Sequence, residues 1–135
     1  MRVLVCGGRD YWDKDRVWAV LNEVCNPAGD PLPEGVTIIH GGAAGADRLA
    51  DGWAVHNWVT IEEYPADWAK HGRGAGPIRN AKMLAEGRPD WVVVFPGGRG
   101  TADMARRAEA AGVKVIRVAG SAAPPSGSTS TARTA

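Results

Sequence analysis

The chain has 135 residues, 44% of them hydrophobic, and a formal net charge of +1. This length fits one domain, which can bury roughly two-thirds of the surface of its unfolded chain without disulfides or metals. The near-neutral charge excludes the global positive field of proteins that bind bulk DNA, so nucleic acid is not the expected partner.

The cysteines and the hydropathy of the sequence indicate which cellular location and which bound groups to expect. Cys6 and Cys25 lie in unlike positions, and the sequence has neither a CxxC motif nor a Cys/His cluster for zinc. No run approaches the roughly 20 apolar residues that span a bilayer, and the apolar run at 3–5 is too short for a signal peptide. We therefore expect a cytoplasmic protein without a metal, a cofactor or a membrane partner.

The first half of the chain alternates apolar runs with amphipathic segments. Asp13 is placed to cap a helix whose apolar face carries Val17, Leu21 and Val24. Three prolines and two glycines at 26–35 exclude regular structure there. The predicted elements of this half are a strand at 2–6, a helix at 14–24, a strand at 36–40, a helix at 46–57 and a strand at 59–64.

The second half continues the alternation after a predicted long loop at 65–76. Long loops inside compact domains are often functional. Pro77 is expected as the first residue of a helix, because its missing N–H would be unpaired there anyway. Thr101 is expected to cap the last helix, and Gly112 to end it in the left-handed conformation. The predicted elements are a helix at 77–86, a strand at 91–95, a helix at 101–111 and a strand at 113–118.

Strands that alternate with helices indicate an α/β fold, a Rossmann-like three-layer sandwich with a mostly parallel sheet of about five strands. Residues 1–118 are expected to form this domain. From Ala119 onward the chain consists of Ala, Ser, Thr, Pro and Gly with one arginine, so it cannot offset its ordering entropy. We expect residues 119–135 to be a disordered tail.

Three Gly-Gly pairs each follow a predicted strand. Because the carboxyl ends of parallel strands share one edge of a sheet, the three turns are expected to meet there. Glycine lets backbone N–H groups approach a ligand, and a helix that begins there adds the positive end of its dipole. The expected ligand is an anion, most simply a phosphate. The pairs are Gly7-Gly8, Gly41-Gly42 and Gly97-Gly98.

The third turn is the most specific of the three. It joins an apolar strand to a helix, and its threonine hydroxyl can reach a phosphate oxygen. It contains neither a Walker A Gly-Lys-Ser/Thr nor the dinucleotide Gly-x-Gly-x-x-Gly pattern, which disfavours a standard ATPase or NAD enzyme. The alternative is a tight turn that needs glycine only for its geometry. The ligand-binding residues predicted here are Pro96, Gly97, Gly98, Arg99, Gly100 and Thr101.

The second turn also places glycines between a predicted strand and the start of a predicted helix. Its predicted ligand-binding residues are Gly41, Gly42, Ala43, Gly45 and Asp47. Asp47 has two equally supported roles. It stabilises the helix dipole by about 0.3–1 kcal/mol, or it accepts hydrogen bonds from a ribose or a base. His40, which precedes the turn, fits packing better than catalysis.

Two arginines are candidate phosphate ligands. Arg9, which follows Gly7-Gly8, can clamp a phosphate bidentately or pair on the surface with Asp10 or Asp13. Arg79 and Asn80 offer a cation and an amide near the start of a helix, where the alternative for Arg79 is a solvated helix charge.

Six tryptophans are many for so small a domain. Trp53 and Trp91 fit core positions. The other candidates are harder to place in a core, namely Trp12, Trp58 and Trp68. Each has three alternative roles: it stacks on a base, lies in a subunit interface, or packs against other side chains of the domain.

Four motifs together resemble the SLOG superfamily, and more closely its YspA-type branch, over about residues 1–118. They are Gly-Gly-Arg-Asp at 7–10, His-Gly-Gly-Ala-Ala-Gly-Ala-Asp at 40–47, Arg-Asn at 79–80 and Phe-Pro-Gly-Gly-Arg-Gly-Thr-Ala-Asp-Met at 95–104. The resemblance implies a Rossmann-like nucleotide-binding core and a homodimer. The superfamily also contains the LOG phosphoribohydrolases and the DNA-processing protein DprA.

The LOG resemblance implies a possible catalytic pair, with one departure. In LOG enzymes a loop Pro-Gly-Gly-x-Gly-Thr-x-x-Glu supplies a glutamate that works with an arginine, and Arg79 falls at the arginine position. The glutamate position is Met104 here, and Asp103 stands one residue earlier, about 100° away around a helix. This departure weakens a catalytic prediction but not a binding one.

We therefore expect a small domain that binds a nucleotide or a nucleotide-derived molecule through its Gly-rich turns. The alternative is a phosphoribohydrolase acting on nucleoside monophosphates, with Arg79 and Asp103 as its catalytic residues. A second alternative, DprA-like binding of single-stranded nucleic acid, fits the near-neutral charge least.

Overall fold

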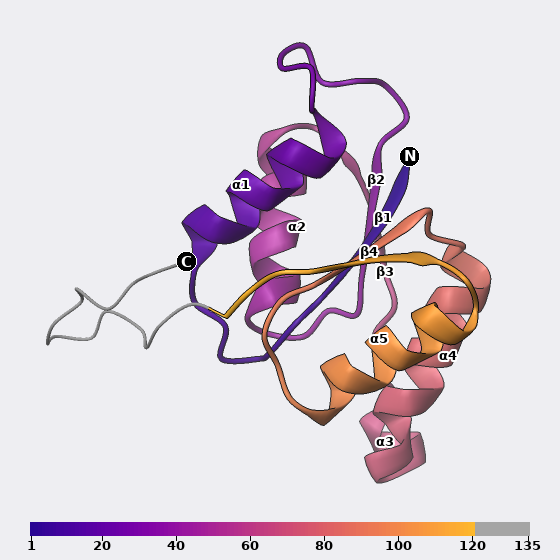
Figure 1. The fold of residues 1–135 in the computed structure, drawn as a ribbon. Coiled ribbons are helices and arrows are strands. Elements are labelled where there is room, and N and C mark those ends of the chain that lie inside the picture. The colour runs from indigo at the N-terminus through magenta and orange to yellow at the C-terminus, as the bar shows by residue number, and fades with distance from the viewer. Residues whose placement is uncertain (121–135) are drawn as a thin grey trace, which may run out of the picture.

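Five parallel strands form one sheet in a computed structural model that describes residues 1–120. The strand order is β3-β2-β1-β4-β5, so the chain winds outward on one side of β1 and then crosses to the other (Figure 1). The predicted α/β fold with a parallel sheet is confirmed. The strands are β1 (Arg2–Cys6), β2 (Thr37–His40), β3 (Thr60–Glu63), β4 (Trp91–Val94) and β5 (Lys114–Arg117), and the helices are α1 (Lys14–Cys25), α2 (Ala46–His56), α3 (Trp68–His71), α4 (Ala75–Gly87) and α5 (Arg99–Ala110).

The composition of each strand matches its place in the sheet. The central strand β1 pairs with β2 and β4, and Leu4 lies opposite both Ile39 and Val92. Strands that are covered on both faces read as continuous apolar runs. The edge strands β3 and β5 instead begin and end with exposed polar or charged residues.

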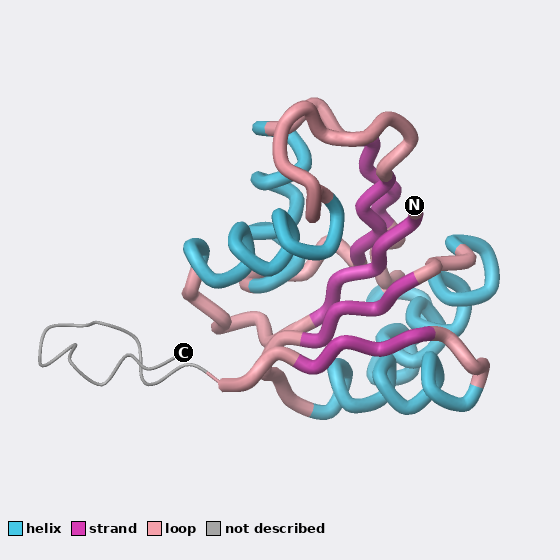
Figure 2. The backbone as a smooth tube through the Cα atoms, turned by 45° about the horizontal axis from the view of Figure 1, so that its top comes forward, coloured by secondary structure: helices cyan, strands magenta, loops and turns pink. Residues whose placement is uncertain are grey.

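Helices cover both faces of the twisted sheet, which makes three layers (Figure 2). Helices α1 and α2 pack on the face to which Val3 and Val5 point, around the fully buried Trp53. Helices α4 and α5 pack on the opposite face, to which Leu4 points, and Met104 is buried there. Successive side chains of β1 alternate between the two cores, as the pleat of a strand requires.

Most predicted elements lie where the sequence placed them. The Asp13 side chain accepts a hydrogen bond from the backbone N–H of Arg16 at 3.1 Å, so it caps α1 as expected. Val17 and Leu21 are buried on that helix. Gly112 has φ +77°, which confirms its left-handed position after α5.

The predicted loop at 65–76 is wrong in part. It contains α3 and a 3-10 turn at Gly72–Gly74, and α4 begins at Ala75 rather than at Pro77. Pro77 is the third residue of α4, where it is tolerated because the first four N–H groups of a helix have no intrahelical acceptor.

The predicted cap of the last helix is also wrong. α5 begins at Arg99, so Thr101 is its third residue, and Gly98 occupies the cap position without a side chain to cap the helix. The helix therefore starts inside the Gly-rich turn instead of after it.

Part of the predicted tail lies outside the described residues, since the structure describes nothing from residue 121 onward. No helix within residues 1–120 combines the length and the apolar character needed to cross a bilayer.

Replacing Trp53 with alanine is expected to lower the free energy of unfolding by about 3–5 kcal/mol, because the ring fills the α1–α2 core. The change also removes the hydrogen bond from the indole N–H to Asn22 Oδ1 at 2.9 Å. The matched control is Trp58→Ala, since Trp58 is 96% exposed and should change stability by less than about 0.5 kcal/mol. Urea denaturation measures both, and equal losses would contradict this core assignment.

Candidate functional site

The Gly-rich turns that follow β1, β2 and β4 meet at the carboxyl edge of the sheet. The backbone N–H of Gly8 donates to the Pro96 carbonyl oxygen at 2.8 Å. The Gly8 carbonyl oxygen accepts from the N–H of Ala46 at 3.2 Å. The first turn is therefore hydrogen-bonded to both of the others.

Several glycines are required by this contact between turns. A Cβ added at Gly7 would lie 2.5 Å from Ala46 Cβ, and one at Gly97 would lie 2.7 Å from the Gly8 nitrogen. Gly45 has φ +76°, and its added Cβ would strike the Gly8 carbonyl oxygen. Geometry alone accounts for glycine at these positions.

Gly98 and Gly100 differ from those glycines. A Cβ at either position would have no atom within 4 Å, so packing does not require glycine there. The backbone N–H groups of Gly98, Arg99, Gly100 and Thr101 donate to no acceptor within residues 1–120. The start of α5 thus presents unpaired donors beside open space.

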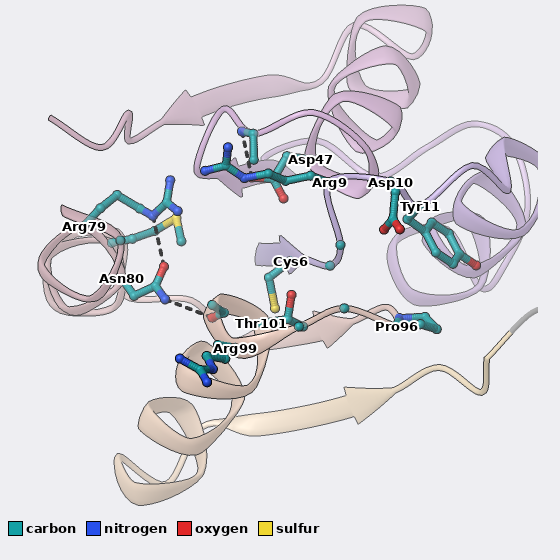
Figure 3. A pocket seen from close by; sticks show the side chains of 18 of the residues that line it. Cys6, Arg9, Asp10, Tyr11, Asp47, Arg79, Asn80, Pro96, Arg99 and Thr101 are labelled. Carbon is teal, nitrogen blue, oxygen red and sulfur yellow. Dashed lines mark hydrogen bonds between the residues drawn. The ribbon is translucent and has the colours of Figure 1, made fainter. Parts of the chain in front are cut away.

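These donors lie in a cleft of about 820 Å³ between β1 and β4, where the winding of the sheet reverses. In open α/β sheets, ligands bind at such a switch point, outside the carboxyl ends of the strands. Figure 3 shows Arg79 and Asn80 entering from α4, with Asn80 hydrogen-bonded at the start of α5 beside Thr101. The lining residues are Cys6, Gly7, Gly8, Arg9, Asp10, Tyr11, Trp12, Ala43, Asp47, Trp68, Gly76, Arg79, Asn80, Met83, Pro96, Gly97, Gly98, Arg99, Gly100 and Thr101.

Most predicted ligand residues line this cleft, and four predicted residues do not. The four are Gly41, Gly42, Gly45 and Asp103. The sequence-based prediction missed Cys6, Asp10, Tyr11, Trp12, Trp68, Gly76 and Met83. Two of these, Trp12 and Trp68, carried a signal in the sequence, because each was hard to place in a core.

Arg79 is half-buried in this cleft. Its Nη1 donates to the Gly41 carbonyl oxygen at 2.7 Å, and its Nε donates to Asn80 Oδ1 at 3.0 Å. Burial lowers the pKa of the Arg79 guanidinium, and the charge of Arg9 adds to that effect, whereas Asp47 opposes it. Within residues 1–120, no carboxylate lies at ion-pair distance from Arg79.

Comparison with known proteins identifies the family. Residues 1–71 match the family described as YspA, cpYpsA-related SLOG. The Gene 61 protein of Mycobacterium phage D29 is 40% identical over 125 residues, which cover 85% of this chain and 94% of that protein. The chain belongs to the YspA-related SLOG family.

Two solved structures share the fold of this SLOG domain. The X-ray structure of DNA processing protein A (DprA) from Streptococcus pneumoniae matches with a TM-score of 0.67 and 17% identity, over 89% of this chain and 50% of that chain. The X-ray structure of TM1055 matches with a TM-score of 0.61 and 18% identity, over 84% of this chain and 71% of that chain. The SLOG domain therefore spans half the length of the DprA chain.

The β2–α2 turn of the SLOG domain is held by side chains at its two ends. Asp47 Oδ2 accepts the backbone N–H of Gly41 at 3.0 Å and that of Ala43 at 3.2 Å. His40 Nδ1 accepts the N–H of Gly42 at 2.9 Å, which assigns the ring proton to Nε2, 2.7 Å from Asp51 Oδ2. Burial raises the pKa of Asp47, although its two hydrogen bonds oppose the shift. Asp47 therefore shapes the turn while it lines the cleft.

Asp103 does not line the cleft, although it contacts Asn80, which does. Its carboxylate accepts hydrogen bonds from Asn80 at 3.0 Å, Arg106 at 2.8 Å and Arg107 at 2.8 Å. Burial alone would raise the pKa of Asp103, but these hydrogen bonds and charges outweigh it and lower the pKa. Met104 is fully buried in the core. Neither position presents an acid to the cleft.

Asp103→Asn is expected to lower the free energy of unfolding by about 1–2 kcal/mol near pH 6, because it removes charge-assisted hydrogen bonds. Since the folded pKa of Asp103 lies below its ordinary value of 3.8, this stability is complete well above pH 3.8 and is lost as the pH falls through the folded pKa. Urea denaturation at pH 6 and pH 3 measures the difference, which should shrink at pH 3.

The control for this prediction is Glu109→Gln. Glu109 pairs with Arg117 at 2.9 Å, but both side chains are more than half exposed. An exposed pair contributes little, so this variant should stay within about 0.5 kcal/mol of the parent at both pH values. A difference for Asp103→Asn that is constant with pH would refute the electrostatic explanation.

Proposed function

We propose that this SLOG domain binds a nucleotide or a nucleotide-derived small molecule, with its phosphate at the N-terminus of α5. The observation that carries the proposal is the set of unpaired N–H donors at 98–101, next to the open positions Gly98 and Gly100. A helix N-terminus adds a partial positive charge, so it favours an anion.

The charge of the cleft supports the same proposal. Three arginines, Arg9, Arg79 and Arg99, line it against two carboxylates, Asp10 and Asp47. The Asp47 oxygen Oδ2 is already used by backbone N–H groups. The chain as a whole has a net charge of only +1, so the positive character of the cleft is local.

The size of the cleft favours a ligand larger than a free phosphate. A volume of about 820 Å³ falls within the range of about 300–1,000 Å³ that is typical of small-molecule sites. A phosphate at α5 would leave room for a ribose and a base near α4 and the β1 turn.

The proposal does not include cleavage of the N-glycosidic bond. A phosphoribohydrolase needs an acid beside the ribose, and Asp103 is engaged by Arg106 and Arg107 outside the lining of the cleft. The homodimer implied by the family resemblance remains a proposal, which light scattering can test. The cytoplasmic location and the domain boundary near residue 118 also remain predictions.

Gly100→Asp is expected to weaken binding of nucleoside 5′-monophosphates and ADP-ribose at least tenfold, because it puts a carboxylate into the open space beside the proposed phosphate position. Gly100 is the second residue of α5, where an acidic side chain complements the helix dipole, so thermal stability should stay equal or rise. Titration calorimetry measures the affinity, and a thermal melt measures the stability.

Ala102→Asp is the matched control for Gly100→Asp. Ala102 is exposed in the same first turn, but it does not line the cleft. It should weaken binding much less than Gly100→Asp does, since its carboxylate is solvent-exposed and lies outside the lining of the cleft. If both variants bind as tightly as the parent, the phosphate does not sit at α5.

Incubation with nucleoside monophosphates is expected to return them intact. Chromatography of the mixture measures free base, under conditions where calorimetry detects binding. Arg79→Gln should weaken the binding about tenfold or more, because a charge-assisted contact to phosphate is lost. Release of free base that disappears in Arg79→Gln would replace the binding proposal with the hydrolase alternative.

A further inference from the structure

Trp68 is an exposed indole at the mouth of the cleft. It lines the cleft, yet 48% of its surface is accessible. Burying an indole is strongly favourable, so a half-exposed one beside a cleft is an available contact surface. The side chain belongs to α3, which Asp67 caps by accepting the N–H of Lys70 at 3.1 Å.

The ring of Trp68 is supported by α4. Gly76 is buried in the first turn of that helix, and a Cβ there would lie 3.5 Å from Cη2 of Trp68. A Cβ at that distance would make an ordinary van der Waals contact, so the indole lies next to the first turn of α4. The ring therefore lies beside the start of α4, the helix from which Arg79 and Asn80 also enter the cleft.

Arg9 lies over this ring, with its guanidinium carbon 5.2 Å from the ring centroid. Arg9 is exposed and forms no ion pair within residues 1–120. A cation–π contact at an exposed site is weak, so the guanidinium can exchange it for a better partner. A phosphate in the same cleft is such a partner, because guanidinium and phosphate match bidentately.

We propose that Trp68 is the stacking surface for the base of the ligand, and that Arg9 leaves the indole for the phosphate when the base arrives. This inference rests on the proposed function and specifies it. The ligand must then carry both an aromatic base and a phosphate, which selects nucleotides over sugar phosphates. Stacking tolerates different bases, since every base has a π face.

The experiment compares each of the four ribonucleoside 5′-monophosphates with ribose 5-phosphate, by titration calorimetry. Ribose 5-phosphate lacks the base, so it reports the phosphate position alone. In the parent protein, the preferred monophosphate should bind roughly 10- to 100-fold more tightly than ribose 5-phosphate. Trp68→Ala should remove that advantage and leave the affinity for ribose 5-phosphate within about twofold, whereas Trp68→Phe should keep part of it.

Trp58→Ala is the control of the same residue type. Trp58 is 96% exposed but does not line the cleft, so this variant should bind both ligands as the parent does. Arg9→Gln gives a second, independent signature. It should weaken ribose 5-phosphate binding and raise the ratio of monophosphate to ribose 5-phosphate affinity, because nothing then competes with the base for the ring.

Different outcomes separate this inference from the proposed function. If monophosphates and ribose 5-phosphate bind the parent equally well, or if Trp68→Ala weakens both by the same factor, the base subsite is wrong and the phosphate site stands. If neither ligand class binds, both proposals fail. A change in oligomeric state of Trp68→Ala by light scattering, with unchanged ligand affinity, would make Trp68 an interface residue instead.

Discussion

The whole arrangement depends on the direct backbone contact between the three Gly-rich turns. Gly8 donates to Pro96 at 2.8 Å and accepts from Ala46 at 3.2 Å, and no side chain separates the turns. Larger residues would force β1 and β4 apart at their carboxyl ends, since an added Cβ at Gly7 or Gly97 would lie within 3.0 Å of the neighbouring chain segment. The contact fixes where α5 starts, and so it fixes the position of the open donors.

A second set of hydrogen bonds connects the cleft to the helices behind it. The side-chain oxygen of Asn80 accepts a hydrogen bond from Arg79 Nε at 3.0 Å. The side-chain nitrogen of Asn80 donates to the Gly100 carbonyl oxygen at 3.1 Å and to the Asp103 carboxylate at 3.0 Å. In this chain Asp103, which stands next to the LOG glutamate position, accepts a hydrogen bond from Asn80, and Asn80 in turn accepts one from Arg79. The lowered pKa keeps the Asp103 carboxylate charged near neutral pH, where it pairs with Arg106 and Arg107 on α5 and accepts from Asn80 on α4.

The sequence predicted the layers and most boundaries because these depend on local patterns, such as the apolar run of β1 and the cap at Asp13. It misplaced the start of α5, since the turn chemistry of Gly98 and Thr101 is equally compatible with a cap three residues later. The sequence could not show that glycine is sterically required at Gly97 but not at Gly100. That difference depends on which atoms of the neighbouring turn an added Cβ would meet. The pairing of Arg9 with Trp68 also escaped prediction, since it joins segments far apart in the chain.

Three features of the cleft leave interactions incomplete in the free protein. Gly100 lies in a helix where alanine would fit, which costs up to about 1 kcal/mol. Arg79 is half-buried, and its side-chain hydrogen-bond partners within residues 1–120 are neutral oxygens such as Gly41 O and Asn80 Oδ1 rather than a carboxylate, and Trp68 exposes half an indole. Such local departures are expected mainly at functional or strained sites. An anion would pair with Arg79 and fill the space at Gly100, and a base would cover Trp68, so one nucleotide would relieve all three.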